Sequence, residues 1–240
     1  MIQSGEQDPS IRLIEETLLP EVRLESVDPF NPIVVHHTPA GWKLLGTGNY
    51  ASVFEHPSLP GKVVKVYAPG RPGWQEECDV YEKLGTHPAY STLHAAGVLD
   101  DRYYLVLKKL EGKTFYNCLR DGTYIPEKAV RDVDKALDYA RSRGLNPKDV
   151  HGKNVMLKDG RGLVVDISDF LQAGPCVMWK DLRKAYFKLY KPLMPKRPFP
   201  MPDWTMDSIR YLYRRLRKKA RLDGRHPQGR RFKAKPGKPG

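Results

Sequence analysis

The 240-residue sequence contains no apolar run long enough to cross a membrane. A membrane-spanning helix needs about 20 consecutive apolar residues, and polar residues interrupt every apolar stretch well before that length. The first ten residues, MIQSGEQDPS, also lack the basic start and the apolar centre of a secretory signal. We therefore predict a soluble, cytoplasmic protein without membrane contact.

Cysteine is scarce, and its spacing excludes some classes of protein. The three cysteines, Cys78, Cys118 and Cys176, are odd in number and far apart, and they show no metal-ligand spacing. This pattern is typical of reduced, packed thiols in a cytosolic protein. The sequence also has no visible internal repeat, so we expect a globular protein rather than a disulfide scaffold or an array.

Acidic residues are nearly absent from the carboxyl end. Residues 211–240 hold 12 Lys and Arg but one acid, Asp223, so this segment carries +11 of the net charge of +13. We predict a nearly neutral globular part and a basic tail. Residues 223–240 of the tail are expected to be disordered, because they are rich in Gly, Pro and basic residues. Such a tail either is a solvated end or binds a polyanion such as RNA or the ribosome through phosphate contacts.

The remaining sequence predicts strands first and then mostly helices. A short helix from Ser10 to about Leu19, capped by Asp8 or Ser10, precedes a loop-like stretch over 21–40. Strands are expected at 42–46, 51–56, 62–67, 96–99 and 103–108. Helices are expected at 74–85, 126–143, 179–189 and from about 204, after a Pro-rich link at 192–202. This order indicates an α+β protein with two lobes.

A glycine-rich segment lies between two predicted strands. It reads Gly46-Thr-Gly48-Asn-Tyr-Ala51-Ser-Val53, a G-x-G-x-x-A pattern that a plain turn also produces. A dinucleotide-binding fold requires a helix after the glycines, but a β-like run follows here. A glycine-rich loop between antiparallel strands is the arrangement that covers ATP phosphates with backbone N–H groups in protein kinases.

A lysine and a glutamate follow this loop in a suggestive order. Lys65 alternates with Val63 and Tyr67 and so shares their face of the strand, although an exposed edge lysine has the same pattern. In the next helix, Glu77 falls on the face of the apolar residues, where a carboxylate usually has a cationic partner. We predict a Lys65–Glu77 ion pair.

The segment 149–166 reads as a hairpin with oxygen-bearing residues at its ends. Asp149 and Asn154 bracket its entrance, and Asp166 follows the apolar run Leu163-Val-Val. Mg²⁺ is held by oxygens, several of which come from water and phosphate, so two protein side chains suffice. We predict Asn154 and Asp166 as metal ligands and Asp149 as the group that binds an attacking hydroxyl, although many hairpins have polar ends.

Together these features resemble the protein-kinase-like superfamily, and most closely small Bacillus-type Ser/Thr protein kinases, with a compact large lobe similar to the RIO and KEOPS-complex kinases. The resemblance covers about 42–190 and matches, in order, the Gly-rich loop 46–53, Lys65, Glu77, Asp149-x-x-x-x-Asn154 and Asp166. It implies ATP and Mg²⁺ as cofactors, with nucleotide contacts at Gly46, Gly48, Val53, Lys65, Glu77, Leu107, Asn154 and Asp166. The segment 105–115 resembles the hinge that binds adenine, with Leu107 at the back of the pocket. Asp181 resembles the aspartate that braces the catalytic loop.

The resemblance also implies a two-lobed kinase-like fold with four parts. These are a leader at 1–40, a β-rich N-lobe at 41–107, a reduced helical C-lobe at 108–222 and the basic tail at 223–240.

The sequence departs from the family pattern around the catalytic aspartate. Pro147-Lys148 stands in place of His-Arg, and His151 occupies the position of the catalytic-loop lysine of Ser/Thr kinases. Lys153 is our candidate for the missing cation. Asp166-Ile-Ser168 replaces Asp-Phe-Gly and is followed by Asp169-Phe170. About 15 residues separate Asp166 from Asp181, which is too short for a full activation segment.

The leading hypothesis is an ATP- and Mg²⁺-dependent Ser/Thr protein kinase. Its substrate is a protein, and the kinase itself is one candidate substrate. The short segment after Asp166 favours a small-molecule phosphotransferase as an alternative. The altered residues around Asp149 leave open a third function, a pseudokinase that binds ATP and scaffolds an assembly through its tail.

Overall fold

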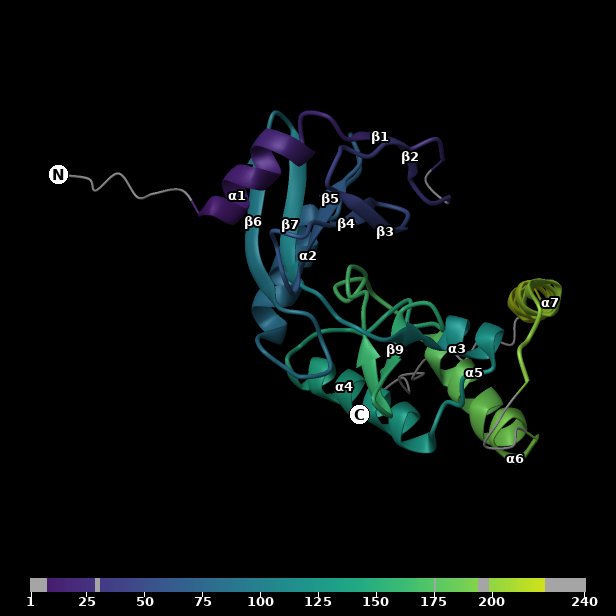
Figure 1. The fold of residues 1–240 in the computed structure, drawn as a ribbon. Helices are drawn as coiled ribbons and strands as arrows, with labels where there is room; N and C mark the ends of the chain where they lie inside the picture. Colours follow the sequence, from purple (N-terminus) through teal and green to yellow (C-terminus); the bar gives the residue numbers. More distant parts are fainter. Residues whose placement is uncertain (1–7, 29–30, 175, 194–198, 223–240) are drawn as a thin grey trace, which may run out of the picture.

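The amino-terminal lobe is built on one antiparallel sheet (Figure 1). The computed structural model describes residues 8–28, 31–174, 176–193 and 199–222. In the sheet the strand order is β3-β4-β5-β7-β6. The strands are β3 Lys43–Thr47, β4 Ala51–Glu55, β5 Lys62–Tyr67, β6 Leu93–Leu99 and β7 Arg102–Lys108. All five were predicted, and the structure extends the fourth strand toward its amino end.

The two faces of this sheet pack against different helices. Val63, Tyr67 and Leu105 belong to the core that includes α2 Trp74–Leu84. The alternate residues Val64 and Val66 belong to a second core, which they share with the amino-terminal helical segment. This alternation follows from the two-residue period of a strand, and it makes β5 a central strand that is buried on both faces.

The amino-terminal segment covers the outer face of the sheet. It consists of α1 Pro9–Leu13 and the π-helical turn η1 Ile14–Leu18, and the Asp8 side chain accepts the N–H of Ser10 as predicted. Ile14, Leu18 and Leu19 are fully buried. The expected helix is therefore confirmed, and it completes the core of this lobe.

The prediction of a loop over 21–40 was wrong. The strands β1 Arg23–Glu25 and β2 Val34–His37 form a small antiparallel sheet with a bulge between Arg23 and Leu24. Both strands are short and mostly exposed, so they lack the alternation of apolar residues that marks a strand in a sequence.

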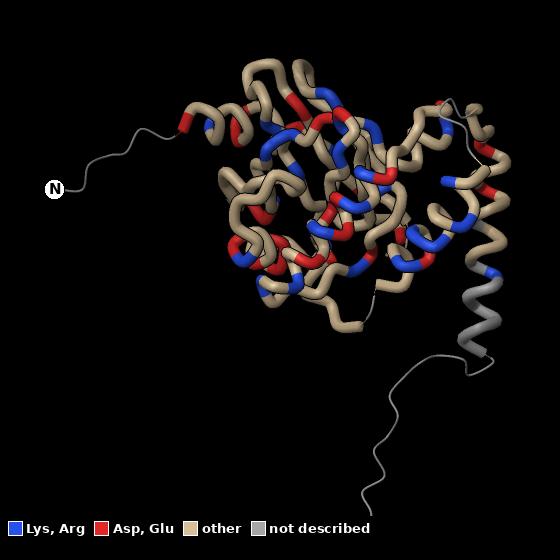
Figure 2. Tube along the Cα trace, turned by 90° about the horizontal axis from the view of Figure 1, so that it is seen from below, with Lys and Arg blue, Asp and Glu red and all other residues tan. Residues whose placement is uncertain are grey.

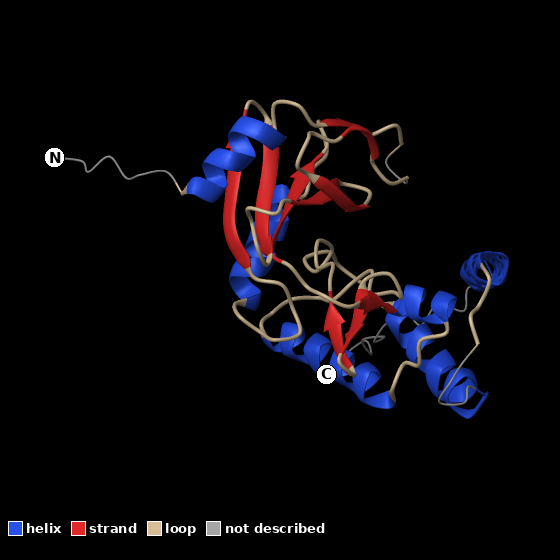
Figure 3. Ribbon diagram, in the orientation of Figure 1, coloured by secondary structure: helices blue, strands red, loops and turns tan. Residues whose placement is uncertain are grey.

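The carboxy-terminal lobe is mostly helical (Figure 3). Its helical elements are α3 Phe115–Asp121, α4 Glu127–Ser142, α5 Val177–Ala185, the π-helical turn η2 Tyr186–Tyr190, α6 Lys191–Leu193 and α7 Asp203–Leu222. A small sheet with the order β10-β9-β8 packs on α4. Its strands are β8 Lys113–Thr114, β9 Val155–Lys158 and β10 Arg161–Val164. The predicted hairpin and the helices at 126–143 and 179–189 are confirmed within a few residues.

The helix α4 supports the hairpin through a closely packed face. Its buried residues lie three and four positions apart, as an amphipathic helix requires: Ala129, Val130, Val133, Ala136, Leu137 and Ala140. Gly162 of β10 lies so close to α4 that an added Cβ would be 2.0 Å from the carbonyl oxygen of Ala129. The hairpin is therefore held at a fixed distance from the helix.

The last helix, α7, lies at the far end of the carboxy-terminal lobe, beside α5 and α6 (Figure 1). Met206 is buried, and the Tyr213 hydroxyl donates to Asp181 over 3.0 Å. The spacing of Ile209, Leu212, Tyr213 and Leu216 in the sequence predicts that these residues dock on the large lobe, but Ile209 and Leu212 are more than half exposed. The side chain of Leu216 and the predicted tail at 223–240 lie outside the described residues. In the described part of the chain, no helix is both long and apolar enough to span a membrane.

Candidate active site

The predicted pair of Lys65 and Glu77 is present and buried. Lys65 Nζ donates to Glu77 Oε2 over 2.6 Å, and the Glu77 side chain is 2% exposed. The Tyr67 hydroxyl donates to the same carboxylate oxygen. Burial raises the pKa of Glu77, and Lys65 offsets part of that rise. Burial alone would lower the pKa of Lys65, but the charges of Glu77 and Asp166 outweigh this effect, so the pKa is raised.

The register of the sheet places the predicted nucleotide contacts on one face. Val53 lies opposite Lys65, and Gly46 lies opposite Val53. Leu107 lies opposite Val63, two residues from Lys65 along β5. Residues directly opposite one another share a face of a sheet, so these predicted residues all face the carboxy-terminal lobe.

The glycine-rich loop forms the tight turn between β3 and β4. The N–H of Gly48 donates to the carbonyl of Ala51 over 2.8 Å, so this amide is used within the turn. A Cβ added at Gly46 would meet no atom within 4 Å. The packing of the protein therefore does not require glycine at position 46, and the open space above it lets a ligand approach the backbone closely.

Asp149 begins the predicted catalytic loop in an unusual backbone conformation. Its φ of 55° lies in the left-handed region, which non-glycine residues seldom adopt and which is frequent at functional sites. The Asn154 side-chain N–H donates to the carbonyl of Asp149 over 3.0 Å and ties the two ends of the loop together. His151 Nε2 is 3.7 Å from Asp149 Oδ2. The five-residue spacing in the sequence thus becomes a closed loop.

Asp166 connects the two lobes. It follows β10, and the backbone N–H of Val165 donates to Asn154, which brings the predicted metal ligands together. Asp166 Oδ1 is 3.9 Å from Lys65 Nζ and accepts the N–H and the hydroxyl of Ser168. Burial raises the pKa of Asp166, but Lys65 and Ser168 outweigh it and lower the pKa. Asp166 is therefore held in its charged form.

The oxygen atoms at positions 154 and 166 suit a magnesium ion. Because Asn154 donates through its nitrogen, its side-chain oxygen remains available as an acceptor. The contacts of Asp166 with Lys65 and Ser168 use Oδ1, so Oδ2 is available to a cation. Among the described residues no cluster of three His, Cys, Asp or Glu side chains could hold a metal. Two oxygen ligands are nevertheless enough for Mg²⁺, which keeps several waters and phosphate oxygens.

Known proteins are similar to this chain over much of its length. The chain is 34% identical over 176 residues to the Bacillus subtilis protein named "Putative serine/threonine-protein kinase YrzF", with 72% of this chain and 79% of that protein covered. The chain belongs to the protein-kinase-like superfamily. Its members are phosphotransferases, and the two-lobed α+β fold agrees with this assignment. A scan of family models gave no match.

More distant kinases match over part of their length. Sperm motility kinase 2A of Mus musculus is 26% identical, with 79% of this chain and 40% of that kinase covered. PknJ of Mycobacterium tuberculosis is 29% identical, with 50% of this chain and 22% of that kinase covered. Among solved structures, the PknI kinase domain of M. tuberculosis is 25% identical with a TM-score of 0.43, and 57% of this chain and 62% of that chain are covered. The chain thus spans less than half of sperm motility kinase 2A and of PknJ.

Lys153 and Asp181 have contacts that the sequence did not predict. Lys153 Nζ lies over the ring of Tyr116, 4.9 Å from its centroid. Its role as the missing cation stays a prediction. Asp181 accepts its hydrogen bond from Tyr213 of α7, and no described contact links it to the catalytic loop. The prediction that Asp181 braces this loop was wrong. Because a long helix follows α5, Asp181 has a partner there that the family pattern does not include.

The structure adds Asp169 to the carboxylates of the site. Burial, Asp149 and Asp166 raise the pKa of Asp169, in that order. Burial and then Asp166 raise the pKa of Asp149 to about 6, whereas Lys148 lowers it. Lys148 donates to Gln172 and Ala173, which fixes its position beside this acidic cluster. For Asp169, the only signal in the sequence was its D-x-x-D spacing from Asp166. No signal in the sequence placed Lys148 beside these carboxylates.

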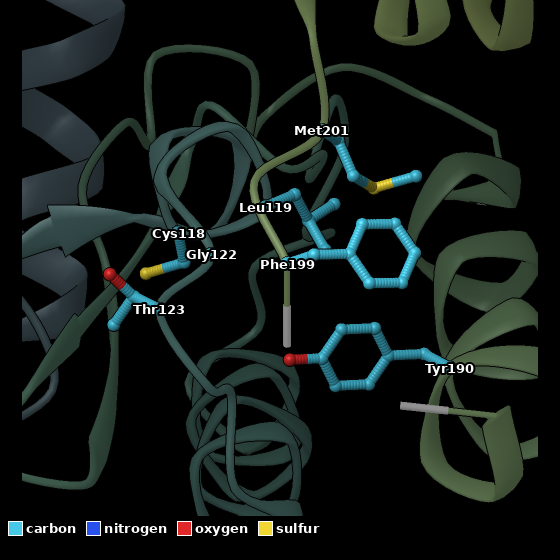
Figure 4. A pocket seen from close by; sticks show the side chains of 7 residues that line it. All are labelled: Cys118, Leu119, Gly122, Thr123, Tyr190, Phe199 and Met201. Carbon is cyan, nitrogen blue, oxygen red and sulfur yellow. The ribbon is translucent and has the colours of Figure 1, made fainter. Parts of the chain in front are cut away.

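A small apolar hollow in the carboxy-terminal lobe is separate from this site (Figure 4). Cys118 of α3, Tyr190 of η2 and the side chains of Phe199 and Met201 contribute to its lining. None of its lining residues belongs to the kinase site. The Met201 N–H donates to the carbonyl of Leu119, so the segment before α7 is attached here.

Proposed function

We propose that this kinase transfers the γ-phosphoryl group of ATP to a Ser or Thr hydroxyl of a protein, in a Mg²⁺-dependent reaction. The observation that carries this proposal is the position of Lys65, which contacts Glu77 in one lobe and lies 3.9 Å from Asp166 of the other. A lysine between two carboxylates is oriented, charged and close to the proposed metal ligand. This arrangement suits an amine that binds phosphate oxygens.

In the proposed reaction, the side chains of this chain position the reactants. Lys65 binds phosphate oxygens, the backbone at Gly46 approaches the phosphates, and Asn154 and Asp166 hold Mg²⁺. When bound, Mg²⁺ neutralises charge on the phosphate oxygens. Asp149 accepts the hydrogen bond of the acceptor hydroxyl and orients it for attack. Val53 and Leu107 supply apolar surface for the adenine.

The first experiment follows the label from γ-labelled ATP in the presence of Mg²⁺. We expect label on a protein Ser or Thr, and on the chain itself if it autophosphorylates. Asp166→Ala should abolish both Mg²⁺-dependent ATP binding and turnover, whereas Asp149→Asn should bind MgATP without transferring phosphate. Asp159→Asn, at the exposed tip of the hairpin, serves as a matched control. Unchanged turnover in Asp166→Ala would refute the proposal.

A second candidate is a small-molecule phosphotransferase. The observation that favours it is the short connection of residues 167–176 between Asp166 and α5, which leaves little chain for docking a peptide. Label recovered on a small molecule from a metabolite pool, and not on protein, would support this function. Binding of MgATP without transfer to any acceptor would instead support an ATP-binding pseudokinase that acts as a scaffold.

We also propose that residues 211–240 contact RNA or the ribosome, on the basis of their charge of +11. Filter binding to RNA at two salt concentrations, with and without residues 223–240, tests this proposal. Phosphate contacts weaken steeply with salt, so the full-length chain should bind more tightly at low salt than the truncated chain. Equal binding by the two chains would remove residues 223–240 from the proposal.

A further inference from the structure

The excess of basic over acidic residues lies in the part of the chain that begins at α5. Residues 1–176 contain 21 Lys and Arg and 24 Asp and Glu, whereas residues 177–240 contain 20 Lys and Arg and four Asp. Within the described part of this region, residues 177–193 of α5, η2 and α6 hold five Lys and Arg and one acid. Figure 2 shows the blue positions that gather along the helical segment beside α7. The charge is therefore present on folded helices as well as in the tail.

These basic residues share one face of the helical segment. Lys180, Lys184, Lys188 and Lys191 follow one another at intervals of four, four and three residues, which places them in a row along a helix. The opposite face contains Trp179 and Tyr186, both buried in the core. The row is thus exposed because the helix is anchored by its other side.

Most of the ammonium groups in this row have no acidic partner. Among the described residues, no acid lies within ion-pair distance of Lys180, Lys184 or Lys188. Lys191 is the exception, because it donates to Glu127 of α4 over 2.5 Å. Like charges four residues apart destabilise a helix. An uncompensated row of this kind is typical of a surface that meets a polyanion.

The row borders a hollow between α4 and α5 that contains further bases and an aromatic ring. This open hollow of about 430 Å³ is lined by Arg131, Asp134, Lys135, Arg183 and Phe187. The Asp134 carboxylate is already occupied, since it accepts from Arg183 and from Trp179 Nε1. Lys135 is exposed and has no acidic partner among the described residues. The hollow therefore adds positive charge to the row.

Phe187 distinguishes this surface from a merely solvated basic face. Phe187 is half-buried, and the Arg183 guanidinium and the Lys191 ammonium lie 5.5 and 5.8 Å from its ring centroid. An aromatic ring among cations is the combination that binds single-stranded nucleic acids, where bases stack on the ring and phosphates meet the cations. An acidic peptide would use the lysines but gain little from the ring.

We propose that the face formed by Arg131, Lys135, Lys180, Arg183, Lys184, Phe187, Lys188 and Lys191 binds single-stranded nucleic acid. Successive lysines, one per helical turn, contact successive phosphates, and Phe187 provides a stacking surface for a base. This binding site is separate from the phosphotransfer site, and it does not require residues 223–240. We therefore expect the carboxy-terminal lobe of this kinase to dock on nucleic acid or on an assembly that contains nucleic acid.

The test is fluorescence anisotropy with the full-length chain and labelled single-stranded oligouridylate or oligothymidylate over a range of salt concentrations. Lys184→Gln/Lys188→Gln should weaken binding and lower the slope of log affinity against log salt by about 1.4, since each contact to a single strand contributes about 0.7. The control Lys83→Gln/Lys108→Gln removes two exposed charges from the other lobe and should leave the slope unchanged. Phe187→Leu should weaken binding with little change in slope, because stacking is not ionic.

Three outcomes would overturn the proposal. One is a salt slope in Lys184→Gln/Lys188→Gln equal to that of the unaltered chain. Another is an equal loss in the two double variants, which would assign binding to overall charge. The third is displacement of the oligonucleotide by polyglutamate as effectively as by unlabelled oligonucleotide, which would assign the face to an acidic protein. None of these outcomes bears on phosphotransfer, since ATP turnover is measured separately.

Discussion

At the scale of single residues, the most informative group is the buried carboxylate of Glu77. A charged side chain with 2% exposure is costly unless it has partners, and Glu77 has two, Lys65 and the hydroxyl of Tyr67. Tyr67 is the partner that the sequence did not reveal. The two donors come from the same face of β5, so they hold α2 against the sheet without any contribution from the other lobe.

Glu77→Gln should therefore affect both stability and catalysis. Loss of the charge weakens two hydrogen bonds to a charged group, and we expect the free energy of unfolding to fall by about 1.5–3 kcal/mol. The kcat/KM for ATP should fall by about 100-fold, because Lys65 loses its orientation. Urea unfolding and steady-state kinetics measure the two effects. Glu76→Gln, an exposed neighbour on α2, is the control, and a similar loss there would argue against a specific role for Glu77.

Asp149 predicts a pH dependence of stability in the absence of nucleotide. Its folded-state pKa of about 6 lies above the ordinary 3.8, because burial and then Asp166 disfavour the charge. The stabilising contribution of protonated Asp149 is therefore complete below about pH 4 and is lost as the pH rises through 6. Asp149→Asn should gain stability relative to the unaltered chain between pH 4.5 and 7.5, as measured by urea unfolding at several pH values.

The size of this effect should be small, because the Asp149 side chain is 42% exposed and solvent screens its interactions. Asp159→Asn, at the exposed hairpin tip, should show no comparable crossover with pH. If stability relative to Asp149→Asn instead rose with pH, the assigned direction of the pKa shift would be wrong.

At the scale of elements, the hairpin β9–β10 owes its position to α4. The catalytic loop and Asp166 lie at the two open ends of this hairpin, so their separation depends on how the hairpin packs. Gly162 allows β10 to approach the backbone of α4, where any larger residue would collide with the Ala129 carbonyl. The distance between a sheet and a helix is thus part of the active-site geometry.

Gly162→Ala should be strongly destabilising. The colliding atom belongs to the backbone and cannot rotate away, so we expect a loss of at least about 2 kcal/mol in the free energy of unfolding. Gly46→Ala is the matched control, since its Cβ meets no atom within 4 Å, and its thermal midpoint should be nearly unchanged. Its KM for ATP should rise, because a methyl group then stands where the phosphates approach. Equal stability of the two variants in thermal unfolding would contradict the packing argument.

At the scale of the whole molecule, the proposed cofactor site requires both lobes. Lys65, Val53 and Leu107 belong to the amino-terminal sheet, whereas Asn154 and Asp166 belong to the other lobe. A ligand that contacts both lobes favours the state in which they are correctly placed. Nucleotide binding should therefore be visible as stabilisation of the entire chain.

MgATP should raise the thermal midpoint, since a ligand at 100 times its Kd stabilises the folded state by about 2.7 kcal/mol. Removal of Mg²⁺ with EDTA should abolish most of this rise, and Asp166→Ala should show little rise even with Mg²⁺ present. Differential scanning fluorimetry provides the measurement, with Asp159→Asn as the control. A full rise of the thermal midpoint in the presence of EDTA would show that ATP binds without Mg²⁺, which would contradict the proposed role of Asn154 and Asp166.

Much of the fold was predictable because its elements carry local signals. The period of two in β5 and the periods of three and four in α4 determine which residues are buried, and these patterns do not depend on distant contacts. The strands β1 and β2 escaped prediction because they are short and exposed. The attachment of α7 was mispredicted for a related reason: its amphipathic pattern indicates an apolar face but not whether another surface covers it.

The amino-acid sequence by itself determined the order of the kinase motifs, the Lys65–Glu77 pair and the separation of a neutral body from a basic end. These depend on spacing along the chain and on the cost of burying an unpaired charge. Only the tertiary structure decided that Asp169 and Lys148 lie beside Asp149 and Asp166, that Asp181 contacts α7, and that bases of α4 share one hollow with Arg183 and Phe187. Those relations join segments that are distant in the sequence, and folding brings them together through packing that no local pattern records.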